Sequence, residues 1–296
     1  MSRELSVTPP AAETTTLEQG EGGVVVTAGT ARFTVRTLRA EDFPPLPEAG
    51  GDQVVHVPAA AFVATVDKVR RSASRDETRP ILTGILVSAA GSELRMVATD
   101  SYRLSVKETA LEEPLQGGFE ANVPARALEE LRTIVAGTAP EQIEVGVRTN
   151  QVVFAAGGVT LSSRLIDGQF PNYRQLLPEG FEHELRVDGK ELLEVIERVA
   201  IMAQKNAPLR LRFEEGQLTV SAQTPDVGEA KEPMPIPFAG EPFEIGFNPV
   251  FLREGLQSVD SGDVVVKLIS PLRPGLIEAG DGSGFLYLIM PIRLNV

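Results

Sequence analysis

One stretch of about twenty residues occurs twice in this chain, at 25–44 and again 127 positions later at 152–171. In both copies an apolar strand, a turn of small residues and a second strand lead to a Phe-Pro pair. A shorter third copy covers 276–280 and 285–291. Because a repeat of this size marks a folding unit that is used more than once, the sequence predicts a tandem array of one unit.

Amphipathic segments repeat at a similar distance. Phe62, Val66, Val69 and Ala73 have the spacing of one helix face, and the apolar residues at 192, 196, 199 and 203 reproduce it 130 positions later. Such a stripe ordinarily faces a core. We expect helices at 58–74, 124–136, 187–206 and 248–260, separated by short strands such as 84–88, 93–98 and 144–148. This pattern indicates an α+β fold with helices on one face of largely antiparallel sheets.

The length of 296 residues corresponds to about two to three domains. We expect a partial first domain at 1–50, a central domain at 51–178 and a C-terminal domain at 179–296. Polar composition suggests that residues 1–23 are weakly ordered, and 23–47 is expected to form a hairpin against the second domain or to be mobile. Since each repeat needs about 120 to 130 residues, the first domain is expected to lack its opening helix and strands.

Composition argues against catalysis and metal binding. The chain has no cysteine and only two histidines, His56 and His183, which are expected on the surface or at strand edges. The glycine-rich run 280–284 is followed by a strand, so it is interpreted as a hairpin turn and not as a phosphate loop. Asp100 lies among polar residues and is expected to be a turn residue. We therefore expect no enzyme activity, cofactor or metal.

No apolar run reaches the roughly 18 residues that span a bilayer, and no basic-then-apolar signal opens the chain, so a cytoplasmic protein is expected. The net charge of −13 argues at first against nucleic acid. However, Lys68, Arg71 and Arg75 lie at helical spacing opposite the apolar stripe. This basic outer face could be an ordinary solvated surface or a contact for phosphates, and the sequence leaves both interpretations open.

Five motifs occur in a specific order, namely Arg79-Pro-Ile-Leu-Thr-Gly-Ile-Leu86, Val97-Ala-Thr-Asp-Ser-Tyr-Arg-Leu104, Ser163-Arg-Leu-Ile-Asp-Gly-Gln-Phe-Pro-Asn-Tyr173, Glu244-Ile-Gly-Phe-Asn248 and Met290-Pro-Ile-Arg-Leu294. With them, the chain from about Gly23 to Val296 resembles the bacterial DNA polymerase III beta subunit, the sliding clamp family.

The resemblance implies tandem DNA-clamp domains that form a head-to-tail homodimer ring, with helices around a central hole. Such a clamp does no chemistry. It tethers the DNA polymerase III catalytic subunit and other partners to double-stranded DNA without base specificity, and a separate clamp loader places it there. An acidic exterior fits this picture, because it keeps DNA off the outside of the ring.

In this family, partners dock a short peptide into an apolar cleft between the second and third domains. The resemblance assigns this cleft to Leu82, Thr99, Ser101, Tyr102, Arg103, Leu104, Pro171, Gln175, Leu176, Leu288, Met290, Pro291, Ile292 and Arg293. Arg103 and Arg293 would bond the peptide backbone or its acids. Gln175 and Ile292 depart from the basic residue and methionine that are common there, which puts the peptide preference in doubt.

The expected DNA-facing residues are Lys68, Arg71, Arg75, Arg79 and Lys205. Because the first domain is expected to be incomplete, two functions remain open. One is a processivity factor that closes around DNA. The other is a peptide-binding adaptor, or a truncated clamp, that keeps the cleft but cannot close a ring.

Overall fold

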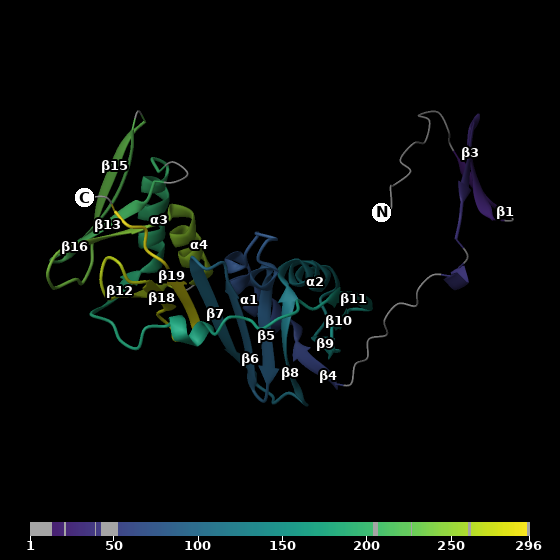
Figure 1. Ribbon diagram of the computed structural model, residues 1–296, viewed down its shortest axis with the longest axis horizontal. Coiled ribbons are helices and arrows are strands. Elements are labelled where there is room, and N and C mark those ends of the chain that lie inside the picture. Colours follow the sequence, from purple (N-terminus) through teal and green to yellow (C-terminus); the bar gives the residue numbers. More distant parts are fainter. Residues whose placement is uncertain are drawn as a thin grey trace. The chain divides into compact units, whose positions relative to one another are not determined.

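The chain folds into two compact units, Met1–Glu48 and Ala49–Val296. The structure is a computed structural model, and it describes residues 14–20, 22–38, 40–42, 53–203, 207–225, 227–259 and 262–294 (Figure 1). None of the described helices is long and apolar enough to cross a bilayer.

The first unit contains a three-stranded antiparallel sheet made of β1 (Thr15–Gly20), β2 (Gly23–Ala28) and β3 (Ala31–Arg36), followed by a 3-10 helix at Ala40–Asp42. The hairpin expected within 23–47 is therefore present as β2 and β3. The expectation of weak order up to residue 23 is wrong for β1, because this strand pairs with β2 along its whole length. Gly22, at a φ of 85°, permits the tight turn between them. Residues 1–13 and 43–47 lie outside the described part.

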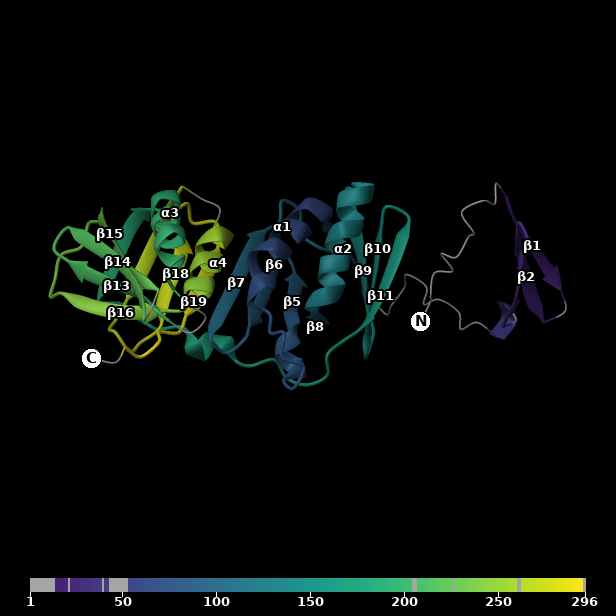
Figure 2. The same ribbon diagram turned by 90° about the horizontal axis from the view of Figure 1, so that it is seen from above.

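The second unit repeats one order of elements twice (Figure 2). The first copy comprises β4 (Gln53–Pro58), α1 (Ala59–Val69), β5 (Gly84–Ala90), β6 (Glu93–Thr99), β7 (Arg103–Ala110), β8 (Gly118–Pro124), α2 (Ala125–Thr138), β9 (Gln142–Val147), β10 (Gln151–Ala156) and β11 (Val159–Arg164). The second comprises β12 (His183–Asp188), α3 (Gly189–Ala200), β13 (Leu209–Glu214), β14 (Gln217–Thr224), β15 (Gly228–Pro235), β16 (Phe243–Phe247), α4 (Pro249–Val259), β17 (Asp263–Leu268), β18 (Gly275–Ala279) and β19 (Phe285–Ile289).

The four predicted helices are confirmed, and each begins one or two residues later than predicted. α1 ends earlier than predicted and α2 ends later. Asp188 caps α3 by accepting a hydrogen bond from the Glu191 N–H at 2.8 Å, and Asn248 caps α4 in the same way. After α1 the chain makes only a 3-10 turn at Arg70–Ser72, because Ala73 is extended and the Ser74 N–H donates to the Leu82 carbonyl at 2.8 Å. Residues 204–206, the end of the third predicted helix, lie outside the described part.

The predicted apolar stripes face two separate cores. Phe62, Val66 and Val69 are buried in the first core, where Phe62 meets the ring of Phe154 at 6.1 Å. The stripe on α3 is buried in the second core. The repeated strand-turn-strand segment is also confirmed. β2 and β10 begin 128 positions apart, one residue more than the 127 positions of the sequence repeat.

The described strands of the second unit form three sheets: an eight-stranded one in the order β12-β17-β18-β19-β7-β6-β5-β8, and two four-stranded ones in the orders β11-β10-β9-β4 and β15-β14-β13-β16. The large sheet joins the two copies of the repeat, because β19 pairs antiparallel with β7 from Phe285↔Lys107 to Ile289↔Arg103. We call this joint the β7–β19 seam. Helices α1 and α4 meet beside it, where the Lys68 ammonium donates to the Val259 carbonyl at 2.9 Å.

Smaller expectations are also confirmed. Residues 280–284 form the turn of the β18–β19 hairpin. His56 and His183 lie on β4 and β12, which are edge strands. His183 stacks on Phe243 with a ring separation of 5.3 Å.

Candidate partner-binding pocket at the β7–β19 seam

The turn between β6 and β7 is held rigidly by its own side chains. Asp100 Oδ1 accepts hydrogen bonds from the N–H groups of Tyr102 and Arg103 at 2.9 and 3.0 Å, which confirms Asp100 as a turn residue. Thr99 Oγ1 donates to the Arg103 carbonyl at 2.7 Å. Ser101 has a φ of 78°, a strained value for a residue with a side chain. The Met290 N–H donates to the Tyr102 carbonyl at 2.9 Å, which ties the turn to the end of β19.

Arg103 is the centre of a buried network that crosses the seam. Its side chain is 9% exposed, and its Nε donates to Asp100 Oδ2 at 3.0 Å. The two terminal nitrogens donate to the Glu254 carboxylate on α4 and to the Arg71 carbonyl after α1. The guanidinium also lies 4.3 Å from the centre of the Phe251 ring. All three nitrogens thus have partners within the protein, and the expected bond from Arg103 to a partner peptide stays a prediction.

Tyr287 packs beneath this network. Its hydroxyl donates to the Phe251 carbonyl at 2.8 Å, and its ring is almost fully buried. Burial raises the pKa of Tyr287 well above its usual value, since the charged form would have to leave water. The phenol is therefore neutral, and it acts as a packing and hydrogen-bonding group at the seam.

Next to the turn lies a cavity of about 160 Å³. Leu104 and Leu288 are buried in its floor, while Leu176 and Met290 are 50% and 42% exposed at its rim. Its complete lining is Thr99, Ser101, Arg103, Leu104, Leu176, Pro274, Leu288 and Met290. We call this cavity the seam pocket. Seven of these residues were expected in the peptide cleft; their role there stays a prediction.

Pro274 is the lining residue that the sequence analysis missed. It precedes β18 in a loop that also contains Pro271 and the exposed Leu272. Prolines on both sides of an exposed leucine give a rigid apolar loop, and this was the available signal.

The other expected cleft residues do not line the seam pocket. Leu82 is buried in the 3-10 helix Pro80–Thr83, and Tyr102 points to the other side of the turn, where it stacks on Phe251 at 6.4 Å. The Ile292 N–H donates to the Gly246 carbonyl at 2.7 Å. The remaining residues lie outside the pocket lining and are exposed or half-buried, namely Pro171, Gln175, Pro291 and Arg293.

The basic face expected on α1 is only partly a free surface. Lys68 is half-buried, bonds the Val259 carbonyl and lies 5.9 Å from the centre of the Phe285 ring. Arg71 Nη1 donates to Gln257 Oε1 at 2.6 Å. Lys68 therefore helps to join α1 to α4, and its expected role toward DNA stays a prediction.

A hollow of about 840 Å³ opens on the other side of the turn. Its basic lining residues are Arg70, Arg71, Arg75, Arg79, Arg103 and Arg126. Arg75 is exposed, and it makes no ion pair with any described residue. Arg79 donates to Asp76 Oδ2 at 3.0 Å and to Ser101 Oγ at 3.2 Å. Hydrogen bonds from Thr78 and then from Arg79 lower the pKa of Asp76. Lys205 lies outside the described residues.

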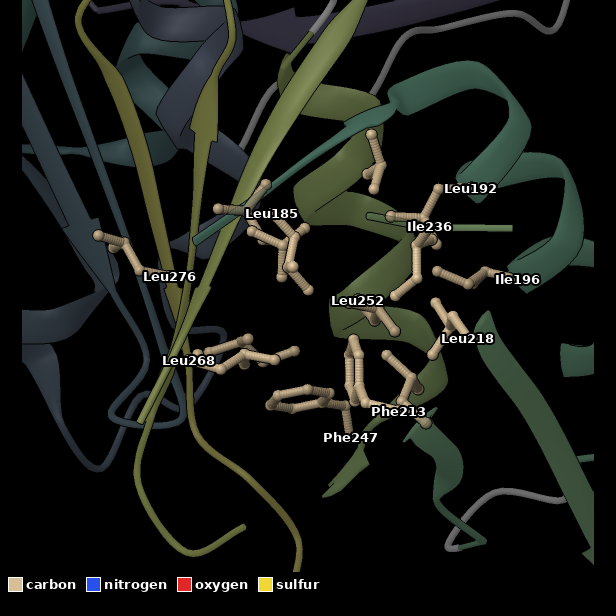
Figure 3. Close-up of a pocket in the computed structure, with 16 residues that line it drawn as sticks. Leu185, Leu192, Ile196, Phe213, Leu218, Ile236, Phe247, Leu252, Leu268 and Leu276 are labelled. Atoms are coloured by element: carbon tan, nitrogen blue, oxygen red, sulfur yellow. The ribbon is translucent and has the colours of Figure 1, made fainter. Parts of the chain in front are cut away.

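A third cavity of about 30 Å³ is enclosed in the C-terminal core (Figure 3). Leu252, Phe213 and Phe247 converge on it, and all of its lining side chains are apolar. This is a packing void and no binding site. Within the described residues, no group of three or more His, Asp or Glu side chains could hold a metal ion.

Comparisons with known proteins identify two consecutive domains. The DNA polymerase III beta subunit central domain matches residues 56–172, and the C-terminal domain of the same subunit matches 174–293. The beta sliding clamp of Synechococcus elongatus is 34% identical over 286 residues, which cover 95% of this chain and 76% of that protein. The clamp of Streptomyces coelicolor is 33% identical, covering 91% of this chain and 74% of its own length.

Solved structures agree. The DNA polymerase III subunit beta of Pseudomonas aeruginosa superposes with a TM-score of 0.82 at 28% identity, over 94% of this chain and 76% of that one. The Thermotoga maritima subunit gives 0.81 at 27% identity, over 95% and 76%. The α+β clamp fold is confirmed, and the chain belongs to the bacterial DNA polymerase III beta subunit family, the beta sliding clamps.

Proposed function

We propose that the protein is a non-catalytic sliding clamp that holds a replicative polymerase on double-stranded DNA in the bacterial cytoplasm. The observation that carries this proposal is the seam pocket, an apolar cavity where seven of the expected partner-binding residues meet. A processivity factor needs such a site to hold its partners, and no base-reading surface is required, because phosphate contacts position a protein without specifying sequence.

The seam pocket suits an apolar side chain carried on a short peptide. Leucines in the floor provide dry contact area, and the rim residue Met290 is flexible enough to adapt to different anchors. Since Arg103 is already engaged, polar recognition would fall to Ser101 and to the exposed Arg293. The DNA polymerase III catalytic subunit and a clamp loader are the partners that we propose for this pocket.

A direct test uses griselimycin, which a Pseudomonas aeruginosa sliding clamp that is 28% identical to this chain binds in a solved structure. We expect labelled griselimycin to bind here, and Leu176→Ala combined with Met290→Ala to weaken it at least tenfold, because two rim contacts each contribute about 1 kcal/mol. Val250→Ala is the matched control, since Val250 is an exposed apolar residue outside the seam pocket. Equal binding by the double variant and the control would reject the pocket assignment.

For DNA, we propose phosphate contacts at Arg75 and Arg79 in the large hollow. Lys68, Arg71 and Lys205 are further proposed DNA contacts. Arg75→Ala should lower the slope of log affinity against log salt by about 1, the loss of one phosphate contact. Arg212→Ala is the control, because Arg212 is exposed on β13 and pairs with Glu214 at 3.0 Å. An unchanged slope for Arg75→Ala would remove Arg75 from the DNA surface.

A peptide-binding adaptor is the second candidate function. It is supported by the fact that the seam pocket lies wholly within the second unit and needs no ring. The two functions differ in whether the protein stays on circular DNA, and homodimer closure is part of the clamp proposal only. The domain limits near residues 50 and 178 also remain proposals.

A further inference from the structure

The eight-stranded sheet carries a cavity of about 560 Å³ on the face that points away from the helices. Along β5, β6 and β8, every second residue is buried in the core with α1 and α2, and the residues between them line this cavity. Ser88 pairs with both Arg95 and Glu120, so these three form one row across the sheet. Leu86 and Asn122 belong to the next row. We call this cavity the outer-face cavity. It shares no lining residue with the seam pocket or with the large hollow.

The other wall of the outer-face cavity is the segment 165–174, every residue of which lines it. The Ile166 N–H donates to the Asn122 carbonyl at 2.9 Å, which ties the start of the segment to β8. Near its end, Phe170 and Tyr173 are buried in an apolar cluster with Val97 on β6. Because both ends of the segment are fixed to the sheet, the cavity has two firm walls.

Asn122 is 7% exposed, and its side chain has a polar atom without a partner. Its Nδ2 donates to the Ile81 carbonyl at 2.9 Å. This bond fixes the orientation of the side-chain amide, because the amide oxygen could not donate to a carbonyl. The amide oxygen, Oδ1, is buried beside Gly84 and accepts no hydrogen bond from any described residue. A buried acceptor without a donor is unfavourable, so a ligand that supplies an N–H group is favoured at this position.

Two carboxylates flank Asn122 at the β8 end of the cavity. Glu120 lies two residues before it on the same face of the strand, and Asp167 follows Ile166, which is bonded to the Asn122 backbone. Both carboxylates are exposed, and neither forms an ion pair within the described part of the chain. One buried amide oxygen and two unpaired carboxylates therefore line the same end of the cavity.

The cations of the cavity lie elsewhere. Arg95 is two strands away from β8, about 10 Å at the usual strand spacing. Its charge is matched by Glu93 at 2.6 Å and by Glu108 at 2.8 Å. Arg174 is exposed at the end of the segment 165–174, with its guanidinium 5.2 Å from the centre of the Tyr173 ring. The β8 end of the cavity is therefore negative, and it favours a positively charged ligand.

We propose that the outer-face cavity binds the side chain of an arginine carried on a protein partner. A guanidinium is planar and has five N–H donors, so one group can bond the Asn122 oxygen and the carboxylates of Glu120 and Asp167 together. The methylene stem of the arginine packs on Leu86 and Ile166. A lysine ammonium is a compact charge with three donors, so it matches these acceptors less well. Such a site does not need the proposed function, because the cavity is separate from the seam pocket.

A nuclear magnetic resonance titration of the full chain with N-acetyl-arginine amide tests the site directly. This capped arginine should shift the signals of the Asn122 side-chain amide and of the Gly168 N–H, because both residues line the cavity. N-acetyl-citrulline amide has nearly the same shape and no charge, so it should bind at least threefold more weakly. Glu120→Gln, Asp167→Asn and Asn122→Leu should each weaken binding of the capped arginine at least threefold, because each removes a charge or an acceptor.

Glu215→Gln is the matched control. Glu215 is an exposed carboxylate in the turn between β13 and β14, in the other copy of the repeat, and its loss should leave binding unchanged. Circular dichroism melts check that Asn122→Leu is folded. Equal binding of the citrulline and arginine compounds would overturn the proposal. So would the absence of shifts at Gly168, or equal binding of the capped arginine by all variants.

Free L-arginine distinguishes two sources of the same guanidinium group. Its α-carboxylate is repelled by the negative β8 end of the cavity, whereas an arginine within a polypeptide has an uncharged backbone. Free arginine should therefore bind more weakly than the capped compound. Tighter binding of the free amino acid would contradict a protein partner and would identify the cavity as a site for a small molecule.

Discussion

Two helical glycines predict opposite effects for the same substitution. Gly255 lies in α4 directly over the Tyr287 ring, and a Cβ placed on it would come within 2.9 Å of three ring carbons. Gly137 lies in α2, and a Cβ there would have no neighbour within 4 Å. Both sites would gain helix propensity from alanine, worth about 1 kcal/mol. Only the Gly255 site has to make room for the added methyl group.

The cost at Gly255 can be worked from its surroundings. The Tyr287 ring is fully buried, so it cannot move into free space, and overpacking of this kind costs about 3 kcal/mol. Its hydroxyl donates to Phe251 on the same helix at 2.8 Å, and a shifted ring would lose that bond, about 1 kcal/mol more. After the gain in propensity, Gly255→Ala should lower the free energy of unfolding by about 3 kcal/mol. Gly137→Ala should raise it by up to about 1 kcal/mol.

Urea unfolding monitored by circular dichroism measures both changes under one set of conditions. Comparable stabilisation by both substitutions would show that α4 does not rest on Tyr287. The contact assigned between α4 and Tyr287 at the β7–β19 seam would then be refuted.

The remaining predictions concern the same half of the molecule. Arg103→Met should lower the free energy of unfolding by about 3 kcal/mol, because it leaves the largely buried Asp100 and the half-buried Glu254 carboxylates without a cation. Arg198→Met breaks an exposed pair with Glu232 and should change the free energy of unfolding far less. Equal effects in urea would contradict the buried network. The pKa of Tyr287 is raised in the folded state, so its contribution to stability is fully present below the ordinary value of about 10 and is lost as the pH rises above it. Tyr287→Phe should remove this part of the fall in stability at alkaline pH. If the stability of both proteins fell with equal slope, the raised pKa of Tyr287 would be contradicted. Val187→Ile should raise the free energy of unfolding by up to about 1 kcal/mol, because the added methyl group fills the core void. Val220→Ile, which is buried away from the void, should lower the free energy of unfolding. Thermal melts that rank the two variants in reverse order would refute the placement of the void.

Much of the fold could be predicted because the repeat and the helix stripes are local signals. The spacing of the apolar residues that begin at Phe62 and Leu192 predicts buried helix faces. The turns at Gly29 and Gly157 have positive φ values, which glycine adopts easily. The strand β1 was missed, because its residues are polar and exposed, and it forms only through backbone pairing with β2. Pairing of that kind leaves no pattern in the strand's own sequence.

The seam pocket shows where sequence reasoning reaches its limit. The resemblance gave the residues of the turn and of β19, and the structure brings Thr99 and Met290 together although they are far apart in the chain. The resemblance could not reveal that Arg103 bonds Glu254, because that contact joins two repeats across 151 positions. The bond from Lys68 to the Val259 carbonyl was equally hidden, since its partner is the end of another helix.

We propose that this protein encircles DNA as a sliding clamp, and retention on circular DNA tests that proposal most directly. The protein would be loaded by a bacterial clamp loader onto a nicked plasmid and then challenged with high salt, which screens contacts with phosphate. We predict that it stays on the circle and is released when the plasmid is linearised. Equal release from both DNA forms would contradict the claim and would favour the peptide-binding adaptor.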